Sequence, residues 1–148
     1  MRLLHLAGVS ADVASTRSRL KKRAFLSACL QNACEDEIAL IVSYLSGVLP
    51  QGRVGLGPSL ISRLLEETPE NDSLPDEPAL KLREVDAIFS EIARVSGQGS
   101  QARRRTLLGK LFTRADVEER TFLARLILGE LRQGALEGVL IDAIADAW

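Results

Sequence analysis

Apolar residues recur every three or four positions along most of the chain, and this periodicity restricts the fold more than any other feature. Such spacing places one apolar face on each helix, whereas strands would need apolar and polar residues in alternation. Leu, Ala, Arg and Glu are abundant, and the sequence has no alternating β-branched runs. We therefore predict an all-α fold with helices over residues 18–33, 35–47, 58–66, 80–95, 101–113, 116–129 and 136–147.

One segment interrupts the helical pattern. Residues 67–79 hold three prolines and five carboxylates, which favours an exposed acidic linker. The chain of 148 residues is 46% hydrophobic and 26% charged, a composition that can bury the core of one domain. Its formal net charge is −1, so an anionic partner has to be bound by a local basic patch.

Several classes of protein are excluded by what the sequence lacks. Cys29 and Cys34 match neither a zinc signature nor a disulfide scaffold, which favours a reducing cytoplasm. The single His5 has no catalytic partner at a recognisable spacing, and no P-loop, nucleophile elbow or metal-binding cluster occurs. No apolar run is long enough to span a membrane, and no signal peptide is recognisable. We expect no membrane contact, no metal site and no catalysis by this chain alone.

The chain matches itself when it is shifted by 82 positions, so that Ser18 lies on Ser100 and Gly47 on Gly129. Nine of the thirty-five positions from 18 to 52 are then identical without a gap. Random pairing would give roughly two or three identities. We predict two helical repeats related by a pseudo-twofold axis, with repeat one at 10–66, the linker at 67–79 and repeat two at 80–148.

Basic residues gather where the first helix of each repeat is expected to begin. The first repeat has five cations in seven residues: Arg17, Arg19, Lys21, Lys22 and Arg23. Like charges repel at such a position and the helix dipole disfavours them, whereas a phosphate would relieve the repulsion. In the second repeat a Gly-rich loop, 96–101, precedes Arg103, Arg104 and Arg105, and Ser100 is the expected N-cap.

Two further loops combine glycine with arginine. Residues 129–135 read Gly-Glu-Leu-Arg-Gln-Gly-Ala, with Arg132 between glycines. Their counterpart at 47–53 ends in Arg53 and is followed by Gly55, Gly57 and Pro58 at an expected helix start. Small residues let a backbone phosphate approach closely, and we expect both loops to face the same way.

Each of these features also has a plain structural explanation. A basic run is commonly a solvated face, and glycine loops commonly only connect helices. Their recurrence on a duplicated frame favours a clamp on the backbone of duplex DNA that reads no sequence. Stacking on single strands is disfavoured because the four phenylalanines sit at core-periodic positions.

The same residues carry a resemblance to a known family. Residues 96–101, Leu111-Phe112, Phe122-Leu123 and residues 129–138 resemble the N-terminal DNA-binding domain of ATP-dependent DNA ligases, as found in bacteria. The likeness is most specific over residues 92–145 and looser around residues 16–20 and 49–51. The family fold is all-helical with internal pseudo-twofold symmetry, and it holds nicked duplex DNA across the minor groove.

The resemblance implies a set of DNA-contacting residues, to which we add Arg103 from the basic helix start. The candidates are Thr16, Ser18, Arg19 and Lys21; Gly99, Ser100, Gln101 and Arg103; and Gly129, Arg132 and Gly134. Arg132 is the foremost candidate because it stands between two glycines. We predict no catalytic residue and no metal ligand in this chain.

The resemblance also implies the wider function. The parent enzyme would seal nicks in DNA replication, repair or recombination through a lysine-AMP intermediate, in the bacterial cytoplasm at the nucleoid. ATP and Mg²⁺ would act in catalytic domains that are absent here, because no lysine stands in a Lys-x-Asp-Gly motif. We expect a monomer that forms part or all of the helical domain. Two alternatives stay open: a helical module that binds an acidic protein, and a sequence-specific helix-turn-helix regulator.

Overall fold

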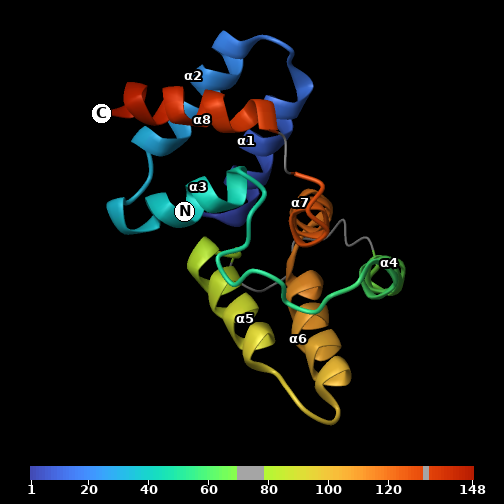
Figure 1. Ribbon diagram of the computed structural model, residues 1–148. Helices are drawn as coiled ribbons and strands as arrows, with labels where there is room; N and C mark the ends of the chain where they lie inside the picture. The colour runs from blue at the N-terminus through green and yellow to red at the C-terminus, as the bar shows by residue number, and fades with distance from the viewer. Residues whose placement is uncertain (70–78, 132–133) are drawn as a thin grey trace.

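The computed structural model describes residues 1–69, 79–131 and 134–148 (Figure 1). Apart from one isolated β-bridge, the regular structure of these residues is helical, which confirms the predicted all-α fold. The elements are α1 (Leu3–Ser15), α2 (Arg19–Gln31), the 3-10 helix η1 (Glu35–Glu37), α3 (Ile38–Leu45), α4 (Pro58–Glu67), α5 (Leu82–Arg94), α6 (Ser100–Arg114), α7 (Val117–Ile127) and α8 (Gly134–Ala147). The seven predicted helices all form, with ends within two residues of the expected positions.

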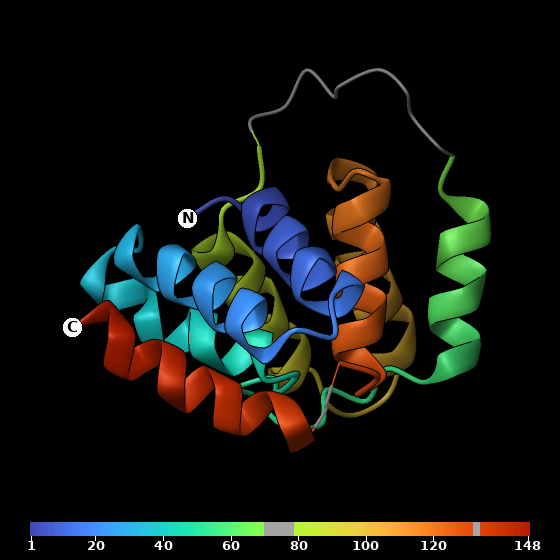
Figure 2. The same cartoon turned by 90° about the horizontal axis from the view of Figure 1, so that it is seen from above.

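Helix α1 was missed by the sequence analysis. Its residues Leu3, Leu6 and Val13 are buried and packed in the core. Their spacing follows one face of a helix, but Gly8 and the exposed Leu4 weaken the pattern. Helix α1 contacts α2, α3 and α7, so it lies near the centre of the molecule (Figure 2).

Reciprocal hydrogen bonds join the starts of α1 and α5. The amide of Leu3 donates to the carbonyl of Leu80 at 2.9 Å, and the amide of Leu82 donates to the carbonyl of Met1 at 3.1 Å. They flank an antiparallel bridge between Arg2 and Lys81. In this contact each segment donates one hydrogen bond to the other and accepts one from it. A twofold axis produces contacts of this reciprocal kind.

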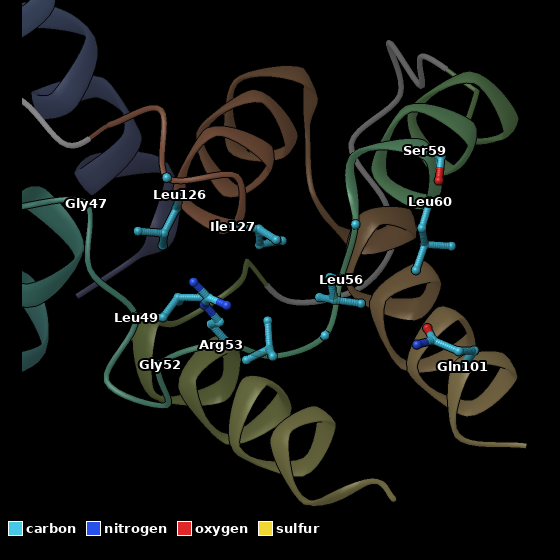
Figure 3. Close-up of a pocket in the computed structure, with 14 residues that line it drawn as sticks. Gly47, Leu49, Gly52, Arg53, Leu56, Ser59, Leu60, Gln101, Leu126 and Ile127 are labelled. Atoms are coloured by element: carbon cyan, nitrogen blue, oxygen red, sulfur yellow. The ribbon is translucent and has the colours of Figure 1, made fainter. Parts of the chain in front are cut away.

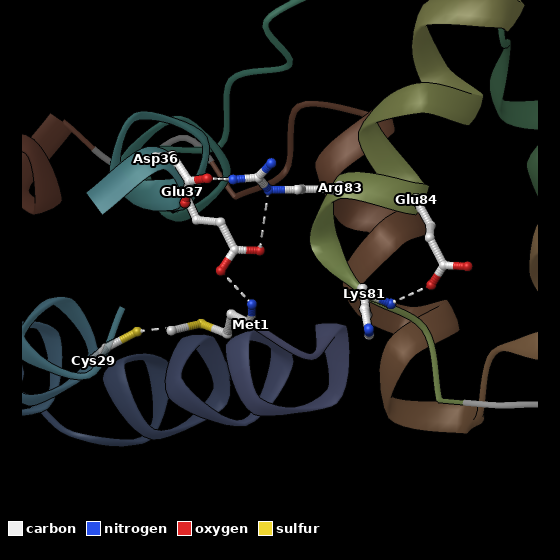
Figure 4. Close-up of polar contacts among 7 residues, drawn as sticks. All are labelled: Met1, Cys29, Asp36, Glu37, Lys81, Arg83 and Glu84. Atoms are coloured by element: carbon white, nitrogen blue, oxygen red, sulfur yellow. Dashed lines mark hydrogen bonds and ion pairs between the residues drawn. The ribbon is translucent and has the colours of Figure 1, made fainter. Parts of the chain in front are cut away.

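Polar contacts surround this junction (Figure 4). Arg83 at the start of α5 pairs with Asp36 and lies 3.9 Å from the carboxylate of Glu37, which also accepts from the Met1 amine. The Glu84 carboxylate accepts from the Lys81 amide at 3.0 Å and caps α5. Glu37 is 5% exposed, as is Glu119, which stands 82 positions further along the chain.

Helices α3 and α7 end in the same way. The amide of Val48 donates to the carbonyl of Ser43, and the amide of Glu130 donates to the carbonyl of Arg125, each at 2.9 Å. The glycine before each donor, Gly47 or Gly129, has a φ of 77° or 73°, a conformation that favours glycine. These matching turns are what the two-repeat prediction requires. The repeats and their boundaries stay a prediction; residue 10 lies inside α1, and 70–78 lie outside the described residues.

The later helices pack across the two halves of the chain. Helix α8 lies along α2, α7 packs on α1, and α4 packs beside α6 (Figures 1 and 2). The core that these contacts bury includes Tyr44, Phe89 and Phe112, all 0% exposed. Residues distant in the sequence therefore share one core, and the loops between helices are brought to the surface around it.

Candidate nucleic-acid interface

The loop that joins α3 to α4 borders a groove of about 660 Å³ (Figure 3). Residues of this loop form one wall, the end of α7 forms another, and the starts of α4 and α6 close the far side. The lining residues are Gly47, Leu49, Gly52, Arg53, Val54, Gly55, Leu56, Gly57, Ser59, Leu60, Gln101, Leu126, Ile127 and Gly129. Two predicted contact residues, Gln101 and Gly129, therefore lie in the same groove although they come from different loops.

The groove loop, residues 46–57, is anchored to α5 through Gln51. Its side-chain amide donates to the Asp86 carboxylate at 2.7 Å, to the Ser90 hydroxyl at 3.0 Å and to the Asp86 carbonyl at 3.3 Å. Leu49, Val54 and Leu56 are buried in the core. These anchors fix the backbone of the loop in one conformation.

A second anchor comes from α6. The Arg104 guanidinium donates to the Val95 carbonyl at 2.6 Å. It also lies beneath Gly55, where a Cβ atom would be 3.0 Å from Nη1. Gly55 has a φ of 69°, so both its conformation and its lack of a side chain are needed here. Arg104, which the sequence placed in a phosphate-binding cluster, instead donates to the loop before α6 and packs against the groove loop.

Arg53 is the cation of the groove loop. It stands between buried Val54 and the exposed Gly52, and its side chain is exposed and extends into the groove (Figure 3). No carboxylate within the described parts of the chain forms an ion pair with it. Arg53 is not among the contact residues predicted from the sequence.

The basic start of α2 has a different environment. The Ser18 hydroxyl accepts from the Lys21 amide at 3.3 Å and caps the helix, and the Thr16 hydroxyl accepts from the Ser18 amide at 3.2 Å. Arg19 pairs with Asp142 of α8 at 2.7 Å, and Arg23 pairs with Asp146 one turn further along both helices.

The sequence suggested that a phosphate relieves the repulsion at this basic start, but carboxylates of α8 already neutralise part of its charge. The hydrogen bond from Arg23 lowers the pKa of Asp146 below its ordinary value. Arg19 also lies beside Gly138, 3.7 Å from the position of a Cβ atom there. Two of the five cations therefore fasten α8 to α2, while Lys21 is exposed.

The contact residues predicted at the start of α6 lie in two different surface depressions. The N-cap is Gly99, with a φ of 77°, so Ser100 is the first helical residue and not the N-cap that the sequence predicted. Gly99, Ser100 and Arg103 line a separate hollow of about 300 Å³ with Glu91, Arg94, Val95, Ser96 and Gln98. Arg103 lies 3.8 Å from the carboxylate of Glu91, and Arg105 pairs with Glu67 at 2.6 Å. Of this corner, only Gln101 reaches the groove.

The turn between α7 and α8 is described in part. Gly129 lines the groove, and Gly134 is the first residue of α8. Arg132, the foremost candidate of the sequence analysis, lies outside the described residues. The structure therefore brings Gln101 and Gly129 together, leaves Gly99, Ser100 and Arg103 in a neighbouring hollow, and ties Arg19 to α8.

The described residues were predicted to hold neither a metal site nor a membrane span. Within residues 1–69, 79–131 and 134–148, no group of three or more His, Cys, Asp or Glu side chains is placed to hold a metal ion. Burial raises the pKa of the Cys29 thiol to about 11. Across the same residues, every helix is too short or too polar to cross a membrane.

Comparison with known protein families gives a match over residues 67–145, to the family described as DNA ligase N terminus. Among curated proteins, the chain is 48% identical over 147 residues to "Probable DNA ligase" of Anaeromyxobacter sp. (strain Fw109-5). It is 46% identical over 147 residues to "Probable DNA ligase" of Mycolicibacterium gilvum (strain PYR-GCK), and 46% identical over 148 residues to "DNA ligase B" of Mycobacterium tuberculosis (strain CDC 1551 / Oshkosh). These matches cover 98–99% of this chain and 27–28% of each relative.

Proposed function

The chain belongs to the DNA ligase N-terminus family, and from this premise we propose that it binds nicked duplex DNA as the N-terminal domain of an ATP-dependent ligase. The proposed contacts are to the phosphate backbone across the minor groove, without recognition of sequence. The observation that carries the proposal is the groove, which is lined by Gln101, Gly129 and the exposed Arg53. Glycine backbone and an unpaired cation are the surface that a phosphodiester chain requires.

The role of the domain in the proposed enzyme is to hold the two ends of a nick in place. Positioning supplies much of the rate of a phosphoryl transfer, because the reacting groups must lie in line. We propose that the lysine that takes AMP from ATP, and the Mg²⁺ sites, belong to parts of the enzyme other than this chain. The chain holds no Lys-x-Asp-Gly sequence. Bacterial DNA would be the substrate, at the nucleoid.

The proposed contact residues at the start of α2, at the start of α6 and in the turn between α7 and α8 differ in how free they are to bind a phosphate. Lys21 and Gln101 are exposed and free to approach a phosphate, and Gly129 offers a backbone without a side chain. Arg19 has to exchange its pairing with Asp142 for a phosphate. Arg132 is retained in the proposal on its sequence position alone. One chain carries all of these contact residues, so we propose that a monomer binds the DNA.

A salt titration with nicked duplex DNA tests the proposal. Fluorescence anisotropy of a labelled nicked duplex would be followed between about 50 and 200 mM salt, where log affinity should fall linearly with log salt, with a slope of about −0.9 for each phosphate contact. Duplexes of unrelated sequence should bind equally. No binding in low salt would favour the alternative of a module for an acidic protein. A preference of about a thousandfold for one sequence would favour a helix-turn-helix regulator.

A further inference from the structure

We propose that Arg53 binds a DNA backbone phosphate in the groove, as a contact additional to those that the family resemblance implies. This inference rests on the proposed function, because it names a ligand for a site in the same interface. The side chain is exposed, extends into the groove and has no carboxylate partner among the described residues (Figure 3). A guanidinium in this state can donate two parallel hydrogen bonds to phosphate oxygens.

The walls of the groove allow a phosphodiester to come close. Four glycines of the loop and Gly129 line it, so much of the surface around Arg53 is backbone. At Gly52, Gly57 and Gly129 no heavy atom lies within 4 Å of an ideal Cβ position, so these stretches open to solvent. A bulky strand of sugar and phosphate can therefore lie along the loop without displacing a side chain.

The donor groups of two side chains beside Arg53, Gln51 of the loop and Arg104 of α6, are already engaged. Gln51 is held by Asp86 and Ser90, and Arg104 is held by the Val95 carbonyl beneath Gly55. Arg53 therefore projects from a backbone that is fixed on both sides. Since the loop need not be ordered on binding, less of the binding free energy is lost as entropy.

The second half of the chain also has an arginine after a left-handed glycine. Arg53 stands six residues after Gly47 and Arg132 three residues after Gly129, so the shift of 82 positions does not pair the two arginines. Arg132 is a candidate contact on family resemblance, whereas Arg53 is inferred from the groove. The proposed contacts therefore include one arginine in each half of the chain, Arg53 from the groove and Arg132 from the resemblance alone.

The test compares Arg53→Ala with Arg63→Ala in the anisotropy titration of the same labelled nicked duplex. Arg63 lies exposed on α4, outside the groove, and forms no ion pair with the described residues, so its loss changes the net charge equally. For Arg53→Ala we expect about a tenfold loss of affinity at low salt and a salt slope shallower by about 0.9. Arg63→Ala should leave both near wild type. Arg53→Lys should restore the slope and part of the affinity.

Each outcome decides between the two proposals. If the wild-type chain fails to bind nicked duplex at low salt, the proposed function is overturned and the role of Arg53 with it. If the wild-type chain binds and Arg53→Ala matches it in affinity and slope, only the inference about Arg53 is overturned. Equal losses in Arg53→Ala and Arg63→Ala would also overturn it, because a general charge effect would then explain both. Thermal melting followed by circular dichroism checks that each variant folds.

Discussion

The start of α2 is rich in cations and the groove loop has one, yet the cation of the groove loop is the one that is exposed without an ion pair to the described residues. At the start of α2, Arg19 and Arg23 pair with Asp142 and Asp146 of α8. In the groove loop, Arg53 forms no ion pair with the described residues. The density of positive charge in a sequence therefore does not locate an anion site, because carboxylates more than a hundred residues away can neutralise it.

The two regions also differ in what holds them. The start of α2 is fixed by a helix cap and by partly exposed ion pairs, which are weak and sensitive to salt. The groove loop is fixed by buried apolar side chains, by hydrogen bonds of Gln51 and by the packing of Gly55 against Arg104. The loop should therefore keep its shape at the salt concentrations where the α2–α8 ion pairs weaken.

The largest effect is expected at Gly55. In Gly55→Val, a β-branched residue would be forced to a positive φ and would press its Cβ against the Arg104 guanidinium. We expect a loss of about 3 kcal/mol in the free energy of unfolding, measured by urea denaturation. Gly57→Ala is the control, since Gly57 has a φ of −87° and no heavy atom near its Cβ position. Equal stability of the two variants would show that the loop is not held as described.

Gln51 should act on DNA binding through the position of Arg53. Gln51→Leu removes three hydrogen bonds from the groove loop, one of them to a carboxylate, and should cost about 1–2 kcal/mol of stability. Affinity for nicked duplex should fall roughly threefold, because the arginine is less well held. In the Arg53→Ala background the same substitution should leave affinity unchanged. A full further loss in that background would contradict a positioning role.

Asp142 tests whether pairing withholds Arg19 from DNA. Asp142→Asn frees the guanidinium and removes a nearby negative charge. Affinity for nicked duplex should rise roughly two- to fivefold at low salt, the range expected of a partly exposed ion pair. Glu118→Gln makes the same change of charge at the far end of α7 from the groove, and it should have little effect. Weaker binding by Asp142→Asn would mean that the pair helps to present Arg19.

The smallest effect concerns the pH dependence of the α2–α8 contact. The pKa of Asp146 is lowered by the hydrogen bond from Arg23. The pair therefore stabilises the fold above the ordinary aspartate pKa of about 3.8 and is lost as pH falls through the lowered value. Thermal midpoints of the wild type and Asp146→Asn should differ slightly at neutral pH and converge in acid. Glu66→Gln, at an exposed carboxylate without an ion pair to the described residues, should show no such convergence.

Most of the fold follows from the sequence, because apolar spacing reports which helix face is buried. The pattern predicted seven helices. It did not predict α1, because Gly8 and the exposed Leu4 interrupt the apolar face of this helix. At the start of α6, Gly99 took the N-cap that Ser100 was expected to occupy, since the loop before it turns through a positive φ. Local propensity does not fix such a turn when the chain on both sides is held by packing.

The candidate site could be predicted only in part. The loops that combine glycine with a polar residue are recognisable in the sequence, and the groove is lined by Gln101 and Gly129 from two of them. Periodicity does not show which residues of an irregular loop face outward, and this is why Arg53 was passed over while Val54 and Leu56 turn inward. Asp142, the partner of Arg19, and Gly55, against which Arg104 packs, come from distant segments, so no local signal could have assigned these contacts.

The crossed packing of the helices bears on how the chain unfolds. Helix α8 packs on α2, α4 on α6, and α7 on α1, so helices from each half of the chain bury apolar residues of the other half. A fragment ending near residue 69, or one beginning near residue 79, would leave apolar surface in water. We expect a single cooperative transition on denaturation, and two severed pieces should regain structure only when mixed.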